Sequence, residues 1–283
     1  MFVLAALTFS ACGAIHRPTP KGISEQMPIP SDLVATIDKS ERLGQAIYVQ
    51  DKASWIATDA LVEEIGLLDD TAIAGWLTLL EAHEAFKPTG TWLVEFFSIE
   101  EPPTILYQVH VPMEPDSSPR VERLNPPREA TPGEVLLIEA RQTAINSISI
   151  RRRMTTVVFP TDPDDPDGIV VYLLAAATNP EVMVLGKHYR IVVGRDDAKV
   201  RTVTELSKSE IDLPMPRDPD ENFIATYVTH VVTDWPLETH VFASLLYRRP
   251  LVVLTKRGVW HVNDGKITFV TDEIPEDLRP LSE

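Results

Sequence analysis

Proline is the residue that most constrains how this chain can fold. The 283 residues include 24 prolines but only 12 glycines. A proline ring fixes φ and removes a backbone donor, so proline ends or kinks helices and suits turns and extended segments. The content of hydrophobic residues is 44% and that of charged residues is 24%, which excludes a mainly disordered chain. We therefore expect a folded protein with many strands and turns and few long helices.

Segments rich in β-branched and aromatic residues predict strands, and turn residues separate them. The predicted strands cover residues 45–50, 53–57, 92–98, 104–111, 155–159, 169–177, 189–193, 200–204, 223–232, 239–247, 251–255, 259–262 and 267–270. Asn263-Asp264-Gly265 joins the last two, because an Asp-Gly pair favours the positive φ of a tight hairpin. The span 73–86 fits a helical pattern, and its part 76–80 fits a strand equally well.

One segment carries a strong helix start. Thr131-Pro132-Gly133-Glu134 is a capping box with proline at the first helical position, and the helix should run to about residue 147. A short helix is expected over 60–65, ended by Gly66. These elements predict an α+β fold: an antiparallel, hairpin-rich sheet with one main helix at about 132–147 and a few short helices.

The chain divides into four predicted parts. Residues 1–11 form an apolar leader, residues 12–38 a proline-broken tether, residues 39–271 a single α+β domain, and residues 272–283 an acidic tail. Within the domain, the proline-rich stretch 112–132 predicts a long surface loop or a lobe boundary.

The leader is typical of a secretory signal peptide. Its apolar run, Phe2 to Ala11, is too short to span a bilayer and ends in small residues directly before Cys12, the only cysteine. Phe9-Ser10-Ala11-Cys12 resembles the lipobox of bacterial lipoproteins. The resemblance implies that residues 1–11 are removed and that Cys12 carries the acyl chains, of the palmitate type, that hold the protein on a membrane. Because Gly13 rather than aspartate follows the cysteine, it also implies the cell envelope, at the periplasmic face of the outer membrane.

Charge and motifs exclude several classes of function. The net charge is −16, which opposes nucleic-acid binding, and we expect Arg151-Arg152-Arg153 to pair with surface carboxylates. The GxG, GxSxG and HExxH patterns of common enzymes are missing, and one cysteine excludes a CxxC site. The acidic loop 162–168 is predicted to be a solvated hairpin loop, because Pro163 and Pro166 break the alternation of calcium ligands.

The segment 229–240 is the part of the chain richest in residue types that bind zinc or iron. His230, Glu238 and His240 are competent zinc ligands, and Glu238 and His240 would share one face if 237–247 were a strand. The same side chains can instead tie strand ends together by hydrogen bonds. The sequence thus predicts a non-enzymatic periplasmic binding or structural module without a cofactor. The partner that it indicates is the membrane, to which the acyl chains on Cys12 attach the protein. The alternative is a metal-dependent hydrolase using zinc at His230, Glu238 and His240.

Overall fold

A computed structural model describes residues 26–66, 72–80, 90–114, 116–149, 152–162, 164–215 and 225–274. Across these residues three helices and fourteen strands form mainly antiparallel sheets, which confirms the predicted α+β class. The predicted signal peptide, Cys12 and the first half of the predicted tether lie outside the described residues.

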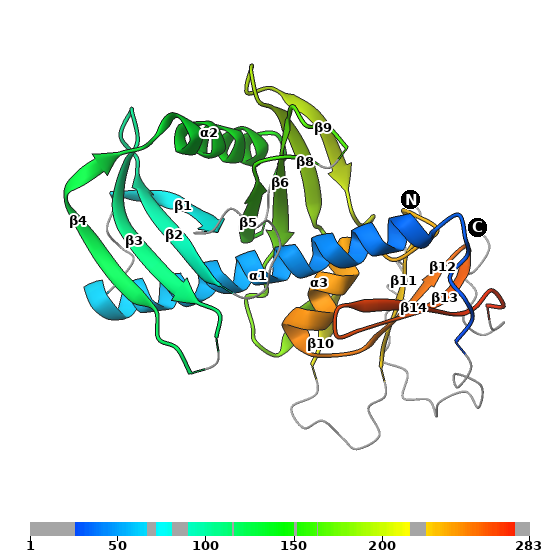
Figure 1. Ribbon diagram of the computed structural model, residues 1–283. Helices are drawn as coiled ribbons and strands as arrows, with labels where there is room; N and C mark the ends of the chain where they lie inside the picture. Colours follow the sequence, from blue (N-terminus) through cyan, green and yellow to red (C-terminus); the bar gives the residue numbers. More distant parts are fainter. Residues whose placement is uncertain are drawn as a thin grey trace, which may run out of the picture.

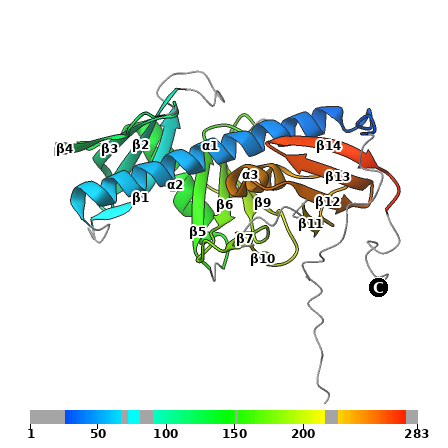
Figure 2. The ribbon, with the colours of Figure 1, turned by 90° about the horizontal axis from the view of Figure 1, so that it is seen from below.

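The longest element is helix α1, Val34–Ile65, which runs past all the larger sheets (Figures 1 and 2). It corrects the two strands predicted at 45–50 and 53–57 and the end of the tether at residue 38. The helix predicted at 60–65 is present and ends at Gly66 as expected, but it starts far earlier than residue 60. The chain has no proline between Pro30 and Pro88, so nothing interrupts 32 residues of helix. The helix is buried against several neighbours, and its apolar residues therefore do not form the single stripe from which a surface helix is recognised.

The first sheet is a meander of four antiparallel strands, packed on the C-terminal half of α1. Its strands, in spatial order, are β1 (Ile73–Leu80), β2 (Thr91–Ser98), β3 (Thr104–Pro112) and β4 (Arg120–Glu129). The strand alternative for residues 76–80 is confirmed, as are the strands at 92–98 and 104–111. The stretch 112–132 is not a plain loop, because β4 occupies ten of its 21 residues, and the lobe boundary stays a prediction. Pro126 and Pro127 are tolerated there because β4 is an edge strand with a bulge.

The second sheet has the order β5-β6-β8-β9 and is covered by α1 and α3 on one face and by helix α2, Pro132–Asn146, on the other. Its strands are β5 (Met154–Phe159), β6 (Gly168–Ala175), β8 (Tyr189–Gly194) and β9 (Val200–Glu205). The predicted capping box is confirmed: the Thr131 hydroxyl accepts from the Glu134 N–H at 3.3 Å, and the Glu134 carboxylate accepts from the Thr131 N–H at 2.7 Å.

The third sheet contains β11 (Thr226–Thr229), β12 (Leu251–Thr255), β13 (Gly258–Asn263) and β14 (Lys266–Thr271), with a small pair, β7 (Val182–Val184) and β10 (Asp212–Pro214), beside it. Helix α3, Glu238–Tyr247, connects β11 to its parallel neighbour β12. The strand predicted at 239–247 is therefore wrong. Seven consecutive residues of α3 are buried, and a helix buried all round shows an unbroken apolar run like that of an interior strand.

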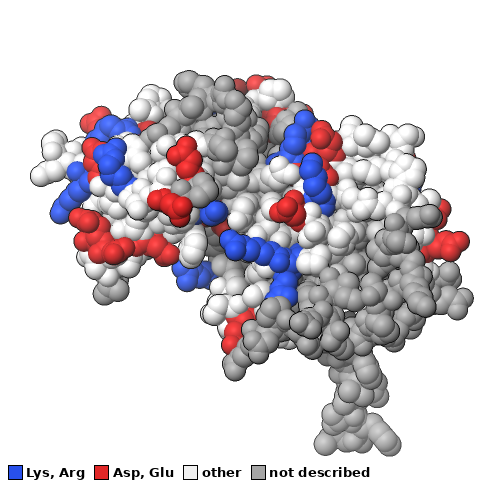
Figure 3. Space-filling model, turned by 60° about the horizontal axis from the view of Figure 1, so that its bottom comes forward, with Lys and Arg blue, Asp and Glu red and all other residues white. Residues whose placement is uncertain are grey.

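Charged groups on the surface are mixed in sign. On the face shown in Figure 3, basic and acidic side chains form small neighbouring groups. Arg152 donates to the Asp212 carboxylate at 3.2 and 3.3 Å, as expected for that cluster, whereas Arg151 lies outside the described residues. Among the described residues, no helix is long and apolar enough to cross a membrane.

The acidic loop 162–168 is more than a solvated hairpin loop. Asp162 is buried and accepts two bonds from the Arg190 guanidinium, at 2.7 and 2.8 Å. Asp165 accepts from Arg201 at 2.6 Å. These ion pairs anchor the loop to β8 and β9, which the spacing of acidic residues and prolines did not reveal.

Candidate functional site

The structure brings together two of the three predicted zinc ligands. His230 directly follows β11 and His240 lies in the first turn of α3, with ring centroids 4.7 Å apart and planes at 85°. The Leu237 N–H donates to His240 Nδ1 at 3.0 Å, and the Thr233 N–H donates to His230 Nε2 at 3.3 Å. Each ring thus accepts from a backbone N–H three residues away in its own segment, and the edge-to-face contact of the two rings joins the end of β11 to the start of α3.

Glu238 is placed elsewhere. Residues two positions apart on a helix are separated by about 200° around its axis, so Glu238 and His240 do not share a face as they would on a strand. The Glu238 carboxylate accepts from the Tyr172 hydroxyl at 2.9 Å inside the core. Within the ranges that the structure describes, no group of three or more His, Cys, Asp or Glu is placed to hold a metal ion. The zinc hydrolase stays a prediction, and in this arrangement it would need a third ligand other than Glu238.

Burial around α3 keeps two histidines and a tyrosine in their uncharged forms. Burial lowers the pKa of His230 to about 4, and burial with the nearby His230 lowers that of His240 well below its ordinary value. Burial and the Glu238 carboxylate raise the pKa of Tyr172 well above its ordinary value. Both imidazoles and the phenol are therefore uncharged at neutral pH. This cluster is a structural centre between α3 and the second sheet rather than an open site.

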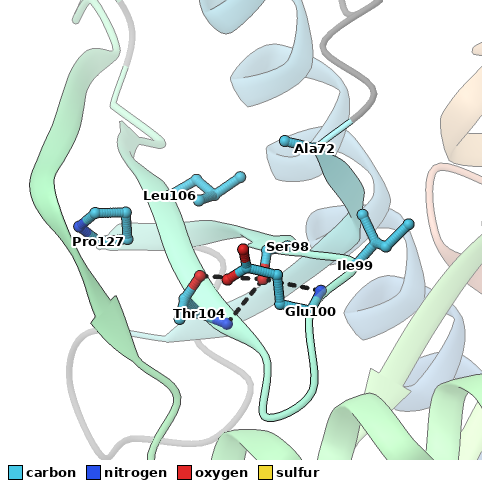
Figure 4. Close-up of a pocket in the computed structure, with 7 residues that line it drawn as sticks. All are labelled: Ala72, Ser98, Ile99, Glu100, Thr104, Leu106 and Pro127. Atoms are coloured by element: carbon cyan, nitrogen blue, oxygen red, sulfur yellow. Dashed lines mark hydrogen bonds between the residues drawn. The ribbon is translucent and has the colours of Figure 1, made fainter.

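An open site lies at one end of the first sheet. A hollow of about 430 Å³ is lined by residues of β2, β3 and β4, of the loop after β2 and of the position before β1: Ala72, Ser98, Ile99, Glu100, Thr104, Leu106 and Pro127 (Figure 4). Figure 4 shows Pro127 and Ile99 on opposite sides of the hollow, with the Glu100 carboxylate between them, close to Ser98 and Thr104. The walls are mostly apolar, and Glu100 is the one charged side chain among these seven.

Irregular strand pairing opens this hollow. Leu106 of β3 pairs with no residue of β2 or β4: its neighbours Ile105 and Tyr107 pair with Phe97 and Phe96 on one side. On the other side they pair with Arg128 and Arg123, so four residues of β4, 124–127, stand opposite Leu106 alone. Such extra residues bend a strand and interrupt its ladder. The bulge therefore carries β4 away from β3 at Leu106, with Pro127 as the far wall.

Hydrogen bonds hold the loop side of the hollow. The Ser98 hydroxyl oxygen accepts from the Thr104 N–H at 3.0 Å, from the Thr104 hydroxyl at 3.0 Å and from the Glu100 N–H at 3.3 Å. The loop is thereby closed on itself, while the Ile99 side chain is left 66% exposed at the rim. An exposed isoleucine beside a preformed apolar hollow is suited to contact with a ligand.

Sequence reasoning missed this site. The prolines of segment 112–132 indicate a loop or boundary, and Arg120-Val121-Glu122-Arg123, with one apolar residue, lacks the alternation of a strand. Pro126-Pro127 fits an edge strand with a bulge but does not by itself predict a strand. Bulges are frequent next to binding sites.

Comparisons with protein-family models, with curated proteins and with solved structures find no match to this chain.

Proposed function

We propose that this protein is a lipoprotein of the bacterial cell envelope, anchored by acyl chains on Cys12, whose folded body is a non-enzymatic binding module. The ligand occupies the hollow between β3 and β4. The observation that supports the binding function is the double bulge around Leu106, which opens a concave, largely apolar site in the first sheet.

The chemistry of the hollow favours a small amphipathic cation. Leu106, Pro127 and Ile99 offer an apolar body to the ligand, and Glu100 offers one carboxylate. A few polar groups in an apolar pocket orient a ligand, while the walls supply most of the binding free energy. The net charge of −16 adds long-range attraction for a cation. An alkylammonium group, or a basic side chain of a partner, has this combination.

The anchor is supported by the order of residues at the N-terminus. Phe9-Ser10-Ala11-Cys12 ends an apolar run, and a proline-containing segment follows it. A buried CH₂ contributes about 0.8 kcal/mol, so two acyl chains hold a protein on a membrane where one chain holds it only marginally. By analogy, Gly13 after the cysteine directs the body to the periplasmic face of the outer membrane.

The anchor is tested by expressing the wild type and Cys12→Ala in a Gram-negative host. We expect the wild type in the membrane fraction, with a mass spectrum showing an acylated N-terminal Cys12, and the variant without acyl chains. A wild type that keeps Met1, carries no lipid and stays in the cytosol contradicts the anchor and leaves the hollow unaffected as a site.

Binding is tested by NMR of the methyl groups of Ile99 and Leu106 during titration with hexylammonium, with hexanol as the uncharged comparison. We expect saturable shifts of both residues, with Glu100→Gln weakening hexylammonium binding several-fold and leaving hexanol unchanged. Glu129→Gln, an exposed carboxylate on the same strand as Pro127, is the matched control and should bind as the wild type does. Methyl signals that do not move with either probe would overturn the assignment of the hollow.

A further inference from the structure

Arg141 is a buried cation between the first two sheets. It projects from α2 towards β1, β2 and β5, and its side chain is only 8% exposed. The guanidinium carbon lies 5.5 Å from the centre of the Trp76 ring and 5.9 Å from that of Phe97, and Nε donates to the Thr156 hydroxyl at 3.0 Å. Among the described residues, two aromatic rings and one hydroxyl are thus the groups that interact with this positive charge.

No carboxylate of the described residues forms an ion pair with Arg141. Burial lowers the pKa of Arg141 only to about 10, so the guanidinium remains protonated at neutral pH. Other buried charges have partners: Glu95 accepts from Arg128 at 2.7 Å, and Asp162 accepts from Arg190. In a chain with sixteen more acidic than basic groups, a buried arginine without a carboxylate is an exception. Contact with two aromatic rings offsets only part of the cost of burying a charge, which points to an anion supplied from outside the chain.

A second donor beside Arg141 also lacks an acceptor. The indole Nε1 of Trp76 is buried and has no hydrogen-bond partner. Its neighbour Gly75 explains how closely the guanidinium approaches β1, because a Cβ at Gly75 would lie 3.0 Å from Arg141 Nη1. Within the described residues the two Nη groups of Arg141 donate to no protein acceptor, and the indole N–H of Trp76 beside them is buried without one. Buried donors such as this N–H are almost always paired in native proteins.

We propose that Arg141 and Trp76 form a binding site for a small oxyanion, namely a carboxylate, phosphate or sulfate group. The two Nη groups donate to two oxygens of the anion, and the Trp76 N–H donates to a third acceptor position. Arginine binds planar or tetrahedral oxyanions in this bidentate manner, and stacking on aromatic rings leaves the edge of its fork available. The site is separate from the hollow between β3 and β4 and does not depend on the function proposed for it.

The test follows the indole N–H signal of Trp76 in the full-length, ¹⁵N-labelled chain. The chain has five tryptophans, and the signal is assigned by its loss in Trp76→Phe. Sodium phosphate, sulfate and acetate are titrated separately at constant ionic strength with sodium chloride as the balancing salt. We expect the Trp76 signal to shift saturably with at least one of the three anions, and which anions act distinguishes inorganic oxyanions from carboxylates.

Variants separate a binding site from a structural arginine. Arg141→Met should abolish the saturable shift of the Trp76 signal. Arg141→Lys keeps the charge but loses the two-pronged guanidinium, so it should weaken anion binding about tenfold; it serves as the test variant if Arg141→Met does not fold. The matched control is Arg123→Met, an exposed arginine 5.9 Å from the Tyr107 ring, which should bind as the wild type does. A Trp76 signal that saturates with none of the anions overturns the proposal. A folded Arg141→Met variant whose Trp76 signal shifts as much as that of the wild type also overturns it. Arg141 would then be a structural residue whose charge is balanced by the two rings.

Discussion

A single glycine allows the tight turn between β13 and β14. Asp264 has φ of 46° and Gly265 has φ of 76°, so two successive residues adopt the left-handed conformation of a two-residue hairpin. We expect Gly265→Val to lower the free energy of unfolding by about 1–2 kcal/mol, because a β-branched side chain is strained at positive φ. A Cβ would also lie 3.3 Å from Gln45 Nε2, which donates to the Gly265 carbonyl. Urea denaturation measures the change.

The control for this turn is Gly265→Asn. Asparagine is the side chain that best tolerates the left-handed region, so this variant should lose clearly less stability than Gly265→Val. Equal losses in the two variants would mean that crowding against Gln45, rather than backbone strain, decides the effect.

At the scale of elements, α1 and α3 cross at Gly44. A Cβ at this position would lie 2.5 Å from Val241 Cβ and 2.6 Å from the Glu238 carbonyl oxygen. In an open helix, replacing glycine with alanine stabilises a protein by about 0.5–1 kcal/mol. Here we expect Gly44→Ala to destabilise it by about 1–3 kcal/mol, because the two helices would have to separate. Thermal and urea denaturation both report the sign.

Gly133 provides the matched comparison for Gly44. It lies in the first turn of helix α2, and a Cβ there would meet no atom within 4 Å. Gly133→Ala should therefore be neutral or stabilising by up to about 1 kcal/mol. If both alanine variants were stabilising, the close approach of α1 and α3 at Gly44 would be incorrect.

One inserted residue also decides how β3 contributes to two cores. Ile105 packs with Phe97 in the core beneath α2, whereas Tyr107 packs with Phe96 in the core against α1. Residues two apart on a regular strand point to the same face. Leu106 as an extra residue breaks this rule, so the bulge that opens the hollow also directs Ile105 to the other side of the sheet.

At the scale of the whole molecule, stability should fall as the pH falls from 6.5 towards 4. Burial lowers the pKa of His188 and of His230 to about 4, and that of His240 further. In this window the unfolded chain binds protons that the native chain does not, and each such proton changes the free energy of unfolding by about 1.4 kcal/mol per pH unit. Burial raises the pKa of Asp51 to about 6, which acts in the opposite direction below that value. We expect a net loss of about 2–5 kcal/mol between pH 7 and pH 4.5.

Two variants test the origin of this pH dependence by urea denaturation at several pH values. His240→Gln can still accept from the Leu237 N–H but does not titrate, so it should flatten the profile. Asp51→Asn removes the opposing group and should steepen the fall below pH 6. A free energy of unfolding that is the same at pH 7 and pH 4.5 in the wild type would contradict the burial of these histidines as neutral groups.

Local features of the sequence determined the α+β class, the helix at 132–146 and most hairpin strands. The capping box at Thr131–Glu134 and the turn at Asp264-Gly265 act within a few residues, and alternation with β-branched residues identifies strands that bury one face. The N-terminal segment likewise carries its own prediction, an acylated Cys12, which depends on adjacent residues alone.

Only the tertiary structure revealed the true extents of α1, α3 and β4, the position of Glu238 relative to the histidines, and the hollow at Leu106. The middle of α1 and most of α3 are buried on several sides, and burial on all sides removes the periodic pattern by which a helix differs from an interior strand. The separation of Glu238 from His240 follows from that helix, and the hollow at Leu106 follows from a mismatch in length between paired strands. Arg141 and Trp76 come from α2 and β1, which are more than sixty residues apart in the chain and meet only because the first two sheets pack together. Contacts between distant segments depend on packing free energy, and no window of neighbouring residues contains that information.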